Sequence, residues 1–241
     1  MPKMIKTRIN GRWDLILPDH RAARPEWDIK TGGWEKARLD SIFETTKKGD
    51  VVYYVGAEEG DMCALLTMWG AEMYLFEPND KVWPNIKAIY DANKLPAPNR
   101  SYIAFAANET TDDNLWNRQW PVDHVMNGEI ISDHGFKNLC EADGTVPKIK
   151  IDDLALTGMG KVPDMISIDV EGAEWEVLRG AEQTLRKYHP RIYLSLHPEF
   201  LFHIYGEYSN DLRQWLKNMG YKETFLDYQH EVHLLYEAND E

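Results

Sequence analysis

The strongest constraint on the fold is a repeated order of short apolar run, glycine-containing turn and longer helical segment. The first such unit joins the run Val51–Val55, through the loop Gly56–Gly60, to a segment at Met62–Trp69 that reads as a helix. Gly70 follows that segment at once, as expected where a helix ends. Strands that alternate with helices predict right-handed βαβ units and a mainly parallel sheet.

The same order continues along the rest of the chain. Further helices are predicted at Trp34–Lys47, Lys81–Asn93, Ala173–Tyr188 and Asp211–Met219, further strands at Glu72–Phe76, Tyr102–Ala107, Lys148–Ile151, Met165–Val170 and Ile192–Leu196, and a closing antiparallel pair at Tyr221–Leu226 and Glu231–Tyr236. The 241 residues fit one domain. We expect an N-terminal extension or lid with the first helix over 1–48, a core over 49–241, and an irregular insertion at about 108–147.

Charge and cysteine content exclude several classes of function. The formal net charge of −13 would repel nucleic-acid phosphates, and no local basic patch offsets it. Cys63 and Cys140 have no CxxC neighbour that would bind zinc, so reduced, intracellular thiols are expected. No apolar run approaches 18 residues. We therefore expect a cytoplasmic protein that binds neither nucleic acid nor membranes.

The loop Gly56-Ala57-Glu58-Glu59-Gly60 is the first candidate for a binding site. Ligands of open parallel sheets bind beyond the carboxyl ends of the strands, and this loop follows the first predicted strand. Two glycines let the backbone approach a ligand closely, and the N-terminus of the next helix would offer free N–H groups to a carboxylate. A tight strand-to-helix turn without a ligand is an equal alternative.

Glu77 begins the second candidate loop, Glu77-Pro78-Asn79, and lies 21 residues beyond Gly56. An acid at about that distance is placed to accept hydrogen bonds from both hydroxyls of a ribose, which indicates an adenosine-containing ligand. The acids Glu58, Glu59 and Asp61 would repel the pyrophosphate of a dinucleotide. They suit the ammonium and sulfonium of S-adenosylmethionine, although a nicotinamide-dependent oxidoreductase would share the architecture and the ribose acid.

The third candidate loop follows the strand at Met165–Val170 and starts at Asp169. An acid at this edge of the sheet can orient a nucleophilic hydroxyl, accept its proton or help to hold a metal. Glu171 and Glu174 lie in the first turn of the predicted helix, where negative side chains are stabilising in any case. We assign no metal ligands, and a divalent ion at Asp169 and Glu171 is a minor alternative.

Two stretches resemble the signatures of the FkbM-type S-adenosylmethionine-dependent methyltransferases. They are VVYYVGAEEGDMCALLTMWGAEMYLFEPND and DMISIDVEGAEWEVLRGAEQTL, and the resemblance runs from about Asp50 to Leu196. It implies a Rossmann-like class I methyltransferase fold, with a mainly parallel seven-stranded sheet and a C-terminal antiparallel hairpin. It also implies O-methylation of a hydroxyl, often on a sugar or natural product. Carried over by motif, Gly56, Ala57 and Gly60 would contact the methionine part of the cofactor, Glu77 the ribose, and Ala107 and Asn108 the adenine.

Two departures from the family pattern affect this interpretation. Similar enzymes usually have Asp where this chain has Tyr54, so the cofactor amine would rely on Glu58 or Glu59. A non-catalytic binding protein with this fold is therefore an alternative. The strand after Pro190 tends to end in Glu-x-His in the family, whereas here His197 alone is kept. His197 becomes a candidate base beside Asp169, and a structural role for this histidine is equally well supported.

The acceptor, a small molecule or a glycan, is the least specified part of the prediction. Aromatic residues of two segments could form its wall or a lid, or could equally be packing residues: Trp116, Trp120 and Phe136 in the insertion, and Trp13, Trp27 and Trp34 near the N-terminus. His230 and His233 lie three apart on a predicted strand and so point to opposite faces, which argues against a metal site made by that pair. The oligomeric state is left open.

Overall fold

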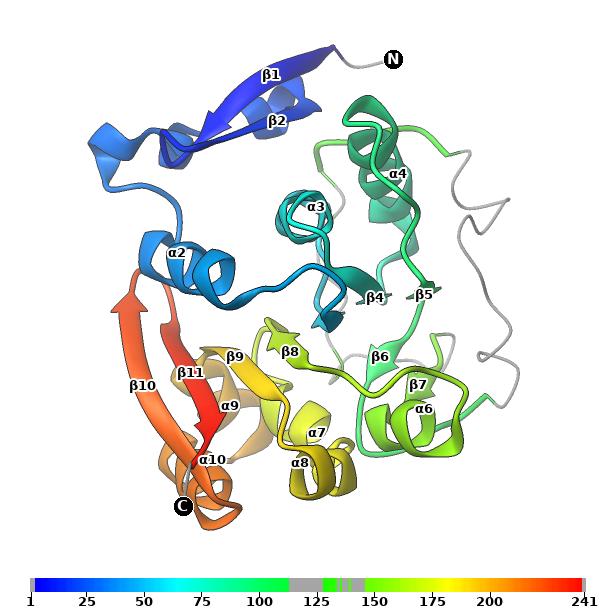
Figure 1. The fold of residues 1–241 in the computed structure, drawn as a ribbon, viewed down its shortest axis with the longest axis vertical. Coiled ribbons are helices and arrows are strands. Elements are labelled where there is room, and N and C mark those ends of the chain that lie inside the picture. The colour runs from blue at the N-terminus through cyan, green and yellow to red at the C-terminus, as the bar shows by residue number, and fades with distance from the viewer. Residues whose placement is uncertain (1–2, 113–127, 134, 136–138, 140–145, 240–241) are drawn as a thin grey trace.

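A seven-stranded sheet forms the centre of the structure, a computed structural model that describes residues 3–112, 128–133, 135, 139 and 146–239. Five strands are parallel: β3 (Val51–Val55), β4 (Glu72–Phe76), β5 (Arg100–Tyr102), β8 (Met165–Ile168) and β9 (Arg191–Leu196). The strand order is β10-β11-β9-β8-β3-β4-β5, in which β11 (Val232–Ala238) lies antiparallel between β9 and β10 (Tyr221–Tyr228). The expected fold is confirmed (Figure 1).

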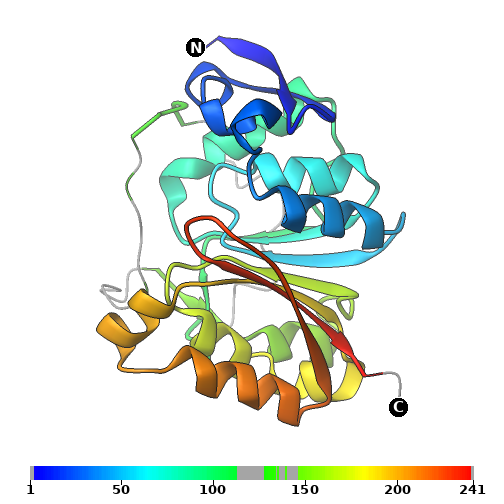
Figure 2. The same cartoon turned by 90° about the vertical axis from the view of Figure 1, so that its left-hand side faces the viewer.

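Helices cover both faces of this sheet, so that it forms the middle of three layers (Figure 2). Alternate residues of β3 enter separate hydrophobic cores, because side chains of a strand point to opposite faces: Tyr53 to one and Val52 and Tyr54 to the other. The core of Tyr54 is shared with α2 (Lys36–Thr45), α3 (Asp61–Met68) and α4 (Trp83–Ala92). The core of Tyr53 is shared with α6 (Ile151–Thr157), α7 (Glu174–Arg179), α8 (Glu182–Tyr188), α9 (Pro198–Tyr205) and α10 (Ser209–Asn218).

An N-terminal hairpin that we did not predict packs over the layer of α3 and α4. It consists of β1 (Met4–Ile9) and β2 (Trp13–Pro18), and it is followed by α1 (Asp19–Ala22) and two short 3-10 helices, Pro25–Trp27 and Ile29–Thr31. The signal was present in the sequence. Asn10 and Gly11 have φ of 51° and 67°, as tight hairpin turns require. Trp13, Leu15 and Leu17 alternate with more exposed residues and are buried.

The prediction of one helix over Ala173–Tyr188 is wrong in one respect. The segment forms two helices, α7 and α8, which are separated at Gly180. The backbone of Ala107 approaches Gly180 so closely that a Cβ there would lie 2.0 Å from the Ala107 carbonyl oxygen. The buried Asp152 then caps α8, since its carboxylate accepts hydrogen bonds from the backbone N–H groups of Gln183 (3.0 Å) and Thr184 (2.8 Å). A tertiary contact and a distant cap decide this break.

Two predicted strands are also shorter than expected. The segment Tyr102–Ala107 leaves the main sheet after β5, and its end, β6 (Phe105–Ala106), pairs with β7 (Lys148–Ile149) in a small parallel sheet. The segment Lys148–Ile151 is a strand only as far as Ile149, and α6 and the later α9 were not predicted. Trp116, Trp120, Phe136 and Cys140, which belong to the expected insertion, lie outside the described residues.

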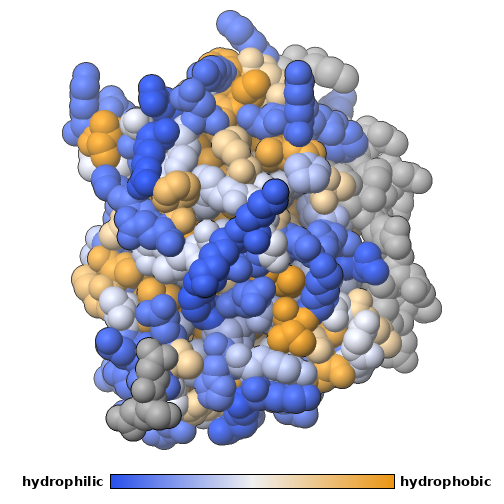
Figure 3. All heavy atoms as spheres, in the orientation of Figure 1, coloured by the Kyte–Doolittle hydropathy of each residue, from blue (hydrophilic) through white to orange (hydrophobic). Residues whose placement is uncertain are grey.

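Hydrophilic side chains dominate the face of the molecule shown in Figure 3, and apolar residues are scattered among them. None of the helices in the described part of the chain has the length and hydrophobicity that a transmembrane segment needs.

Candidate functional site

A cavity of about 570 Å³ opens at the carboxyl ends of the parallel strands. Its lining includes the last residues of β3 and β4, Val55 and Phe76, and Asp169, which directly follows β8, together with the loops that continue from them. It also includes residues from the N-terminal segment and from the turn before β11. All three candidate loops therefore meet at one site, as expected for an open parallel sheet.

Gly56 brings the first and third loops together. It has φ of +86°, and a Cβ at this position would lie 1.7 Å from the carbonyl oxygen of Asp169. The backbone N–H of Asp169 donates to the carbonyl of Val55, so the ends of β3 and β8 are joined directly. A residue with a side chain cannot occupy this position without separating the two loops.

Glu77 is held rigidly at the other side of the cavity. Its carboxylate accepts hydrogen bonds from the backbone N–H groups of Glu58 (2.9 Å) and Asn79 (2.8 Å), and the side chain is largely buried. Pro78 and Asn79 line the cavity beside it. These backbone donors hold the carboxylate fixed at the edge of the site, which is the arrangement that recognition of a ribose needs.

The backbone N–H groups of the glycine loop itself are largely used within the protein. Gly56 and Ala57 donate to the carbonyl of Phe76, Glu58 donates to Glu77, and Gly60 donates to Ala57. A carboxylate in this cavity therefore needs a donor from elsewhere in the chain.

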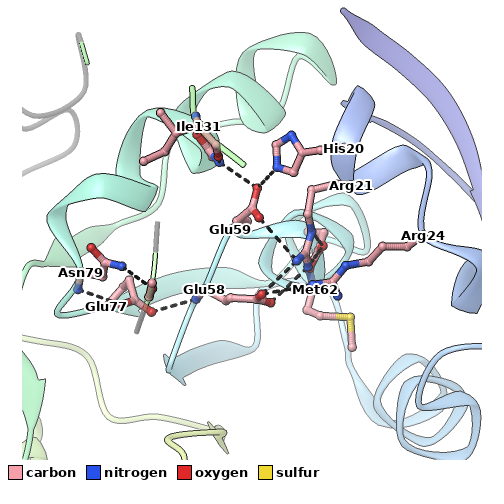
Figure 4. Close-up of polar contacts among 12 residues, drawn as sticks. His20, Arg21, Arg24, Glu58, Glu59, Met62, Glu77, Asn79 and Ile131 are labelled. Atoms are coloured by element: carbon pink, nitrogen blue, oxygen red, sulfur yellow. Dashed lines mark hydrogen bonds and ion pairs between the residues drawn. The ribbon is translucent and has the colours of Figure 1, made fainter. Parts of the chain in front are cut away.

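Arg21, from the N-terminal segment, neutralises the acids of the glycine loop (Figure 4). Its guanidinium is 2% exposed and bonds Asp61 at 2.8 Å and both carboxylate oxygens of Glu58 at 2.9 and 3.1 Å. Glu59 is bonded by His20 (2.6 Å) and Asn85 (2.8 Å) and, like Gly60, does not line the cavity. The structure thus gives the loop acids partners that the sequence did not reveal, because Arg21 lies about 40 residues away.

The N-terminal segment also forms one wall of the cavity, through Arg24, Trp34 and Glu35. Arg24 is the only Lys or Arg side chain among the described residues that line the cavity, and its guanidinium lies over the ring of Trp34 at 5.3 Å. Glu35 is buried and pairs with the buried Arg38. Burial raises the pKa of Glu35 to about 7, although the charge of Arg38 opposes this shift.

Tyr54 lines the cavity close to this wall. Burial raises the pKa of Tyr54 well above its ordinary value, so the phenol stays neutral and supplies no negative charge. Of the other aromatic residues considered, Trp13 packs against Trp69 with ring centroids 5.2 Å apart, and Trp27 is buried. Trp34 is the one of the three N-terminal tryptophans that lines the cavity.

Ala107 and Asn108, which are predicted to contact an adenine, do not line the cavity, whereas their neighbours Ala104, Phe105 and Ala106 do. The physical reason is the short β6, which directs the N–H of Ala107 to the carbonyl of Ile149 (3.0 Å) and so draws the chain away from the cavity. Leu139 and Val82 add apolar surface to this end of the cavity.

At the opposite end of the cavity, carboxylates gather around His197. Its Nδ1 lies 2.6 Å from the fully buried carboxylate of Glu174. Its Nε2 faces Glu171 at 3.4 Å and Asp169 and Glu231 at 3.9 Å each. Asp169, Glu171 and Glu231 all line the cavity. The two residues predicted to be catalytic, Asp169 and His197, are thus neighbours, and the sequence analysis missed Glu231.

Burial and the neighbouring charges shift the pKa values of several groups in this cluster. Burial by itself would lower the pKa of His197, but the hydrogen bond to Glu174 and the charge of Asp169 outweigh it and raise the pKa to about 9. Burial, together with the charge of Asp169, raises the pKa of Glu231 to about 7. Burial also raises the pKa of Glu171. The cluster thus carries excess negative charge that protons partly offset.

His233 lies behind this cluster and is completely buried. Its Nδ1 is 3.2 Å from the hydroxyl of Ser195, and its Nε2 is 3.6 Å from Glu231. Burial lowers the pKa of His233 to about 3, so the imidazole is neutral. His230 lies apart from it in the turn before β11 and lines the cavity beside Trp34, with ring centroids 6.2 Å apart.

One of the solved structures similar to this chain supports the fold. The crystal structure of methyltransferase FkbM from Methylobacillus flagellatus superposes with a TM-score of 0.52 at 14% identity, over 79% of this chain and 44% of that one. This chain thus spans less than half of that protein. Magnesium protoporphyrin IX methyltransferase from Synechocystis, with bound S-adenosylmethionine, superposes with a TM-score of 0.46 at 13% identity, over 84% of this chain and 78% of that one. TrmK of M. capricolum, in complex with S-adenosylhomocysteine, superposes with a TM-score of 0.43 at 13% identity, over 84% of this chain and 67% of that one.

The sequence itself assigns the family. A search of curated protein sequences gave no match. The sequence profile of the family described as the methyltransferase FkbM domain, in contrast, matches residues 50–223. The match confirms the expected family and with it the expected class of cofactor, S-adenosylmethionine. The matched range contains the three loops of the cavity, whereas the N-terminal residues that line the cavity, Arg24, Trp34 and Glu35, precede it. The chain therefore belongs to the FkbM methyltransferase domain family.

Proposed function

We propose that this protein transfers a methyl group from S-adenosylmethionine to a hydroxyl group of a small molecule or glycan. The observation that carries the proposal is a single cavity with the fixed carboxylate of Glu77 on one side and the Asp169 cluster on the other. Its volume of about 570 Å³ lies within the range usual for small-molecule sites. A cofactor can therefore be held at one side while an acceptor is oriented at the other.

The residues of the cavity fit an adenosine cofactor that carries an amino acid. Gly56 leaves room that a Cβ would close, and Glu77 is placed for a ribose. The apolar side chains of Phe105 and Val82 suit an adenine. Since the loop N–H groups are used, Arg24 would bind the cofactor carboxylate. Glu35 would then take the ammonium, which the neutral Tyr54 cannot pair.

The cofactor, when bound, supplies an electrophilic methyl group, and the protein holds the two reactants in the orientation that the transfer needs. Holding two reactants in line can contribute about 7–11 kcal/mol to lowering a barrier, whereas a general base contributes about 3–5 kcal/mol. Asp169 and Glu231 line the cavity and would orient the acceptor hydroxyl and take up its proton. Glu174 fixes the ring of His197 beside them and so keeps the cluster in place.

Apolar side chains border the carboxylate cluster and indicate the shape of the acceptor. Phe200 and Ile204 of α9 line the cavity, and the ring of Phe200 lies parallel to that of His197, with centroids 5.7 Å apart. Both side chains are more than a third exposed. We therefore propose an acceptor that presents an apolar face to α9 and a hydroxyl to Asp169.

Binding of two nucleosides tests the cofactor assignment directly. S-adenosylhomocysteine carries the amino-acid end, and 5′-methylthioadenosine lacks it, so calorimetry on both isolates the role of Arg24. A lost charge-assisted hydrogen bond costs about 1.5–3 kcal/mol, so Arg24→Gln should weaken S-adenosylhomocysteine about 10–150-fold. The affinity for 5′-methylthioadenosine should stay within about twofold.

A matched control and a separate activity assay complete the test. Lys30→Gln removes an exposed cation of the same segment that does not line the cavity, and it should change neither affinity. Equal loss of both ligands in Arg24→Gln would mean general damage to the pocket. Release of S-adenosylhomocysteine in the presence of hydroxylated acceptors tests turnover. Binding of NADH with no binding of either sulfur compound would refute the proposed function.

A further inference from the structure

The carboxylate cluster at the floor of the cavity has the spacing of a metal site. The Nε2 atom of His197 lies 3.9 Å from Asp169 Oδ1, 3.4 Å from Glu171 Oε2 and 3.9 Å from Glu231 Oε2. Ligand atoms about 2.0–2.2 Å from one ion lie about 3–4 Å from each other. One cation placed between these atoms would therefore reach His197, Asp169 and Glu231 with small side-chain adjustments, and the corresponding ligand atoms all lie within 4.8 Å of one another.

The orientation of His197 is the second feature of a metal site. Its Nδ1 is bonded to Glu174 Oε1 at 2.6 Å, and Glu174 is fully buried. Histidines that bind metals almost always donate their other ring N–H to such a carboxylate, which leaves the lone pair of Nε2 for the ion. Glu174 does not line the cavity, but it orients the ring of His197 so that Nε2 faces the carboxylates that do.

A buried imidazole without a hydrogen bond supplies an independent observation. Nε2 of His233 is fully buried, has no hydrogen-bond partner among the described residues, and lies 3.6 Å from Oε1 of Glu231. An unsatisfied buried polar atom costs about 1–3 kcal/mol. The same carboxylate faces His197 through its other oxygen, Oε2, so Glu231 lies between two histidine nitrogens.

We propose that His197, Asp169 and Glu231 form a binding site for one divalent metal cation at the acceptor end of the cavity. Glu171 lies beside this group, with Oε2 3.4 Å from Nε2 of His197. Arg38 does not block the site, because it contacts Oδ2 of Asp169 and leaves Oδ1 facing His197. One imidazole with two carboxylates suits Mn²⁺, Fe²⁺ or Zn²⁺ better than Ca²⁺.

Such a cation would act on the acceptor, and this role rests on the proposed function. A divalent ion orients an oxygen ligand and lowers the pKa of a bound hydroxyl. An acceptor hydroxyl that binds the ion would be held beside Asp169 and would lose its proton to a neighbouring carboxylate. Binding of the ion itself requires neither cofactor nor turnover, so the two proposals fail separately.

Titration of chelator-treated protein with MnCl₂, followed by calorimetry and by electron paramagnetic resonance, tests the site. We expect one Mn²⁺ per chain, with nitrogen modulation from a histidine in the pulsed spectrum. Glu231→Gln and His197→Asn should each weaken Mn²⁺ by more than about tenfold, and His197→Asn should remove the nitrogen modulation. Glu44→Gln, a change at an exposed carboxylate outside the cavity, is the matched control and should bind as wild type.

Circular dichroism and S-adenosylhomocysteine binding of metal-free protein show whether each variant is folded. Where a variant does not fold, the pulsed spectrum of the wild type decides, because it reports whether a histidine nitrogen is bound to the ion. Wild type that binds no Mn²⁺ would overturn the proposal, as would folded Glu231→Gln and His197→Asn that both bind Mn²⁺ as wild type does. Competition by MgCl₂ and ZnCl₂ then identifies the preferred ion.

Discussion

Replacement of Arg21 by Met should destabilise the protein strongly. Arg21 is 2% exposed and holds Asp61, itself 3% exposed, together with Glu58. Removal of one partner of a buried ion pair leaves an uncompensated charge and costs about 3–5 kcal/mol. For a chain of 241 residues, 1 kcal/mol corresponds to about 2–4 °C, so the melting temperature should fall by about 6–20 °C.

Urea unfolding followed by tryptophan fluorescence measures this change, with Arg186→Met as the control. Arg186 makes an exposed pair with Glu182 one helical turn away, which is worth about 0.3–0.5 kcal/mol. A loss below about 1 kcal/mol at pH 7 would refute the reasoning, as would an equal loss in Arg186→Met.

Two further changes test other parts of the structure. Gly56→Ala places a Cβ 1.7 Å from the Asp169 carbonyl oxygen, so S-adenosylhomocysteine affinity measured by calorimetry should fall more than about tenfold; unchanged affinity would contradict the packing of the two loops. Arg213 lowers the pKa of Glu223 to about 2, against burial. A lowered carboxyl pKa stabilises above about pH 4.5, and this contribution is lost as the pH falls toward 2. Arg213→Met should therefore remove about 1 kcal/mol at pH 6, because the pair is partly exposed and Tyr236 and Lys217 also contact Glu223, and little near pH 2; a difference that persists in acid unfolding curves would count against this.

Local sequence was enough to predict the strands of the central sheet, apart from β5. The strands Val51–Val55 and Glu72–Phe76 occur as predicted, because short apolar runs bounded by turn residues have few alternatives in a parallel sheet. The order of strand, glycine loop and helix likewise placed Gly56, Glu77 and Asp169 at one edge, since carboxyl ends of parallel strands share an edge. These are consequences of spacing along the chain.

Where the predicted helix was wrong, a distant contact decided the outcome. The break between α7 and α8 depends on the approach of Ala107 to Gly180. Pairing with Ile149 likewise explains why Ala107 does not line the cavity. The N-terminal hairpin is a different case, because the Asn10-Gly11 turn and the alternation that follows it were visible in the sequence.

The sequence by itself determined the fold, the family and the three loops of the site, because each follows from short-range periodicity and motif spacing. The tertiary structure alone decided the electrostatics of that site. Arg21 neutralises the glycine loop from about 40 residues away, and Glu231 reaches His197 only because β11 is inserted beside β9. Charges interact through space, so a pattern along the chain cannot reveal which of them will be paired.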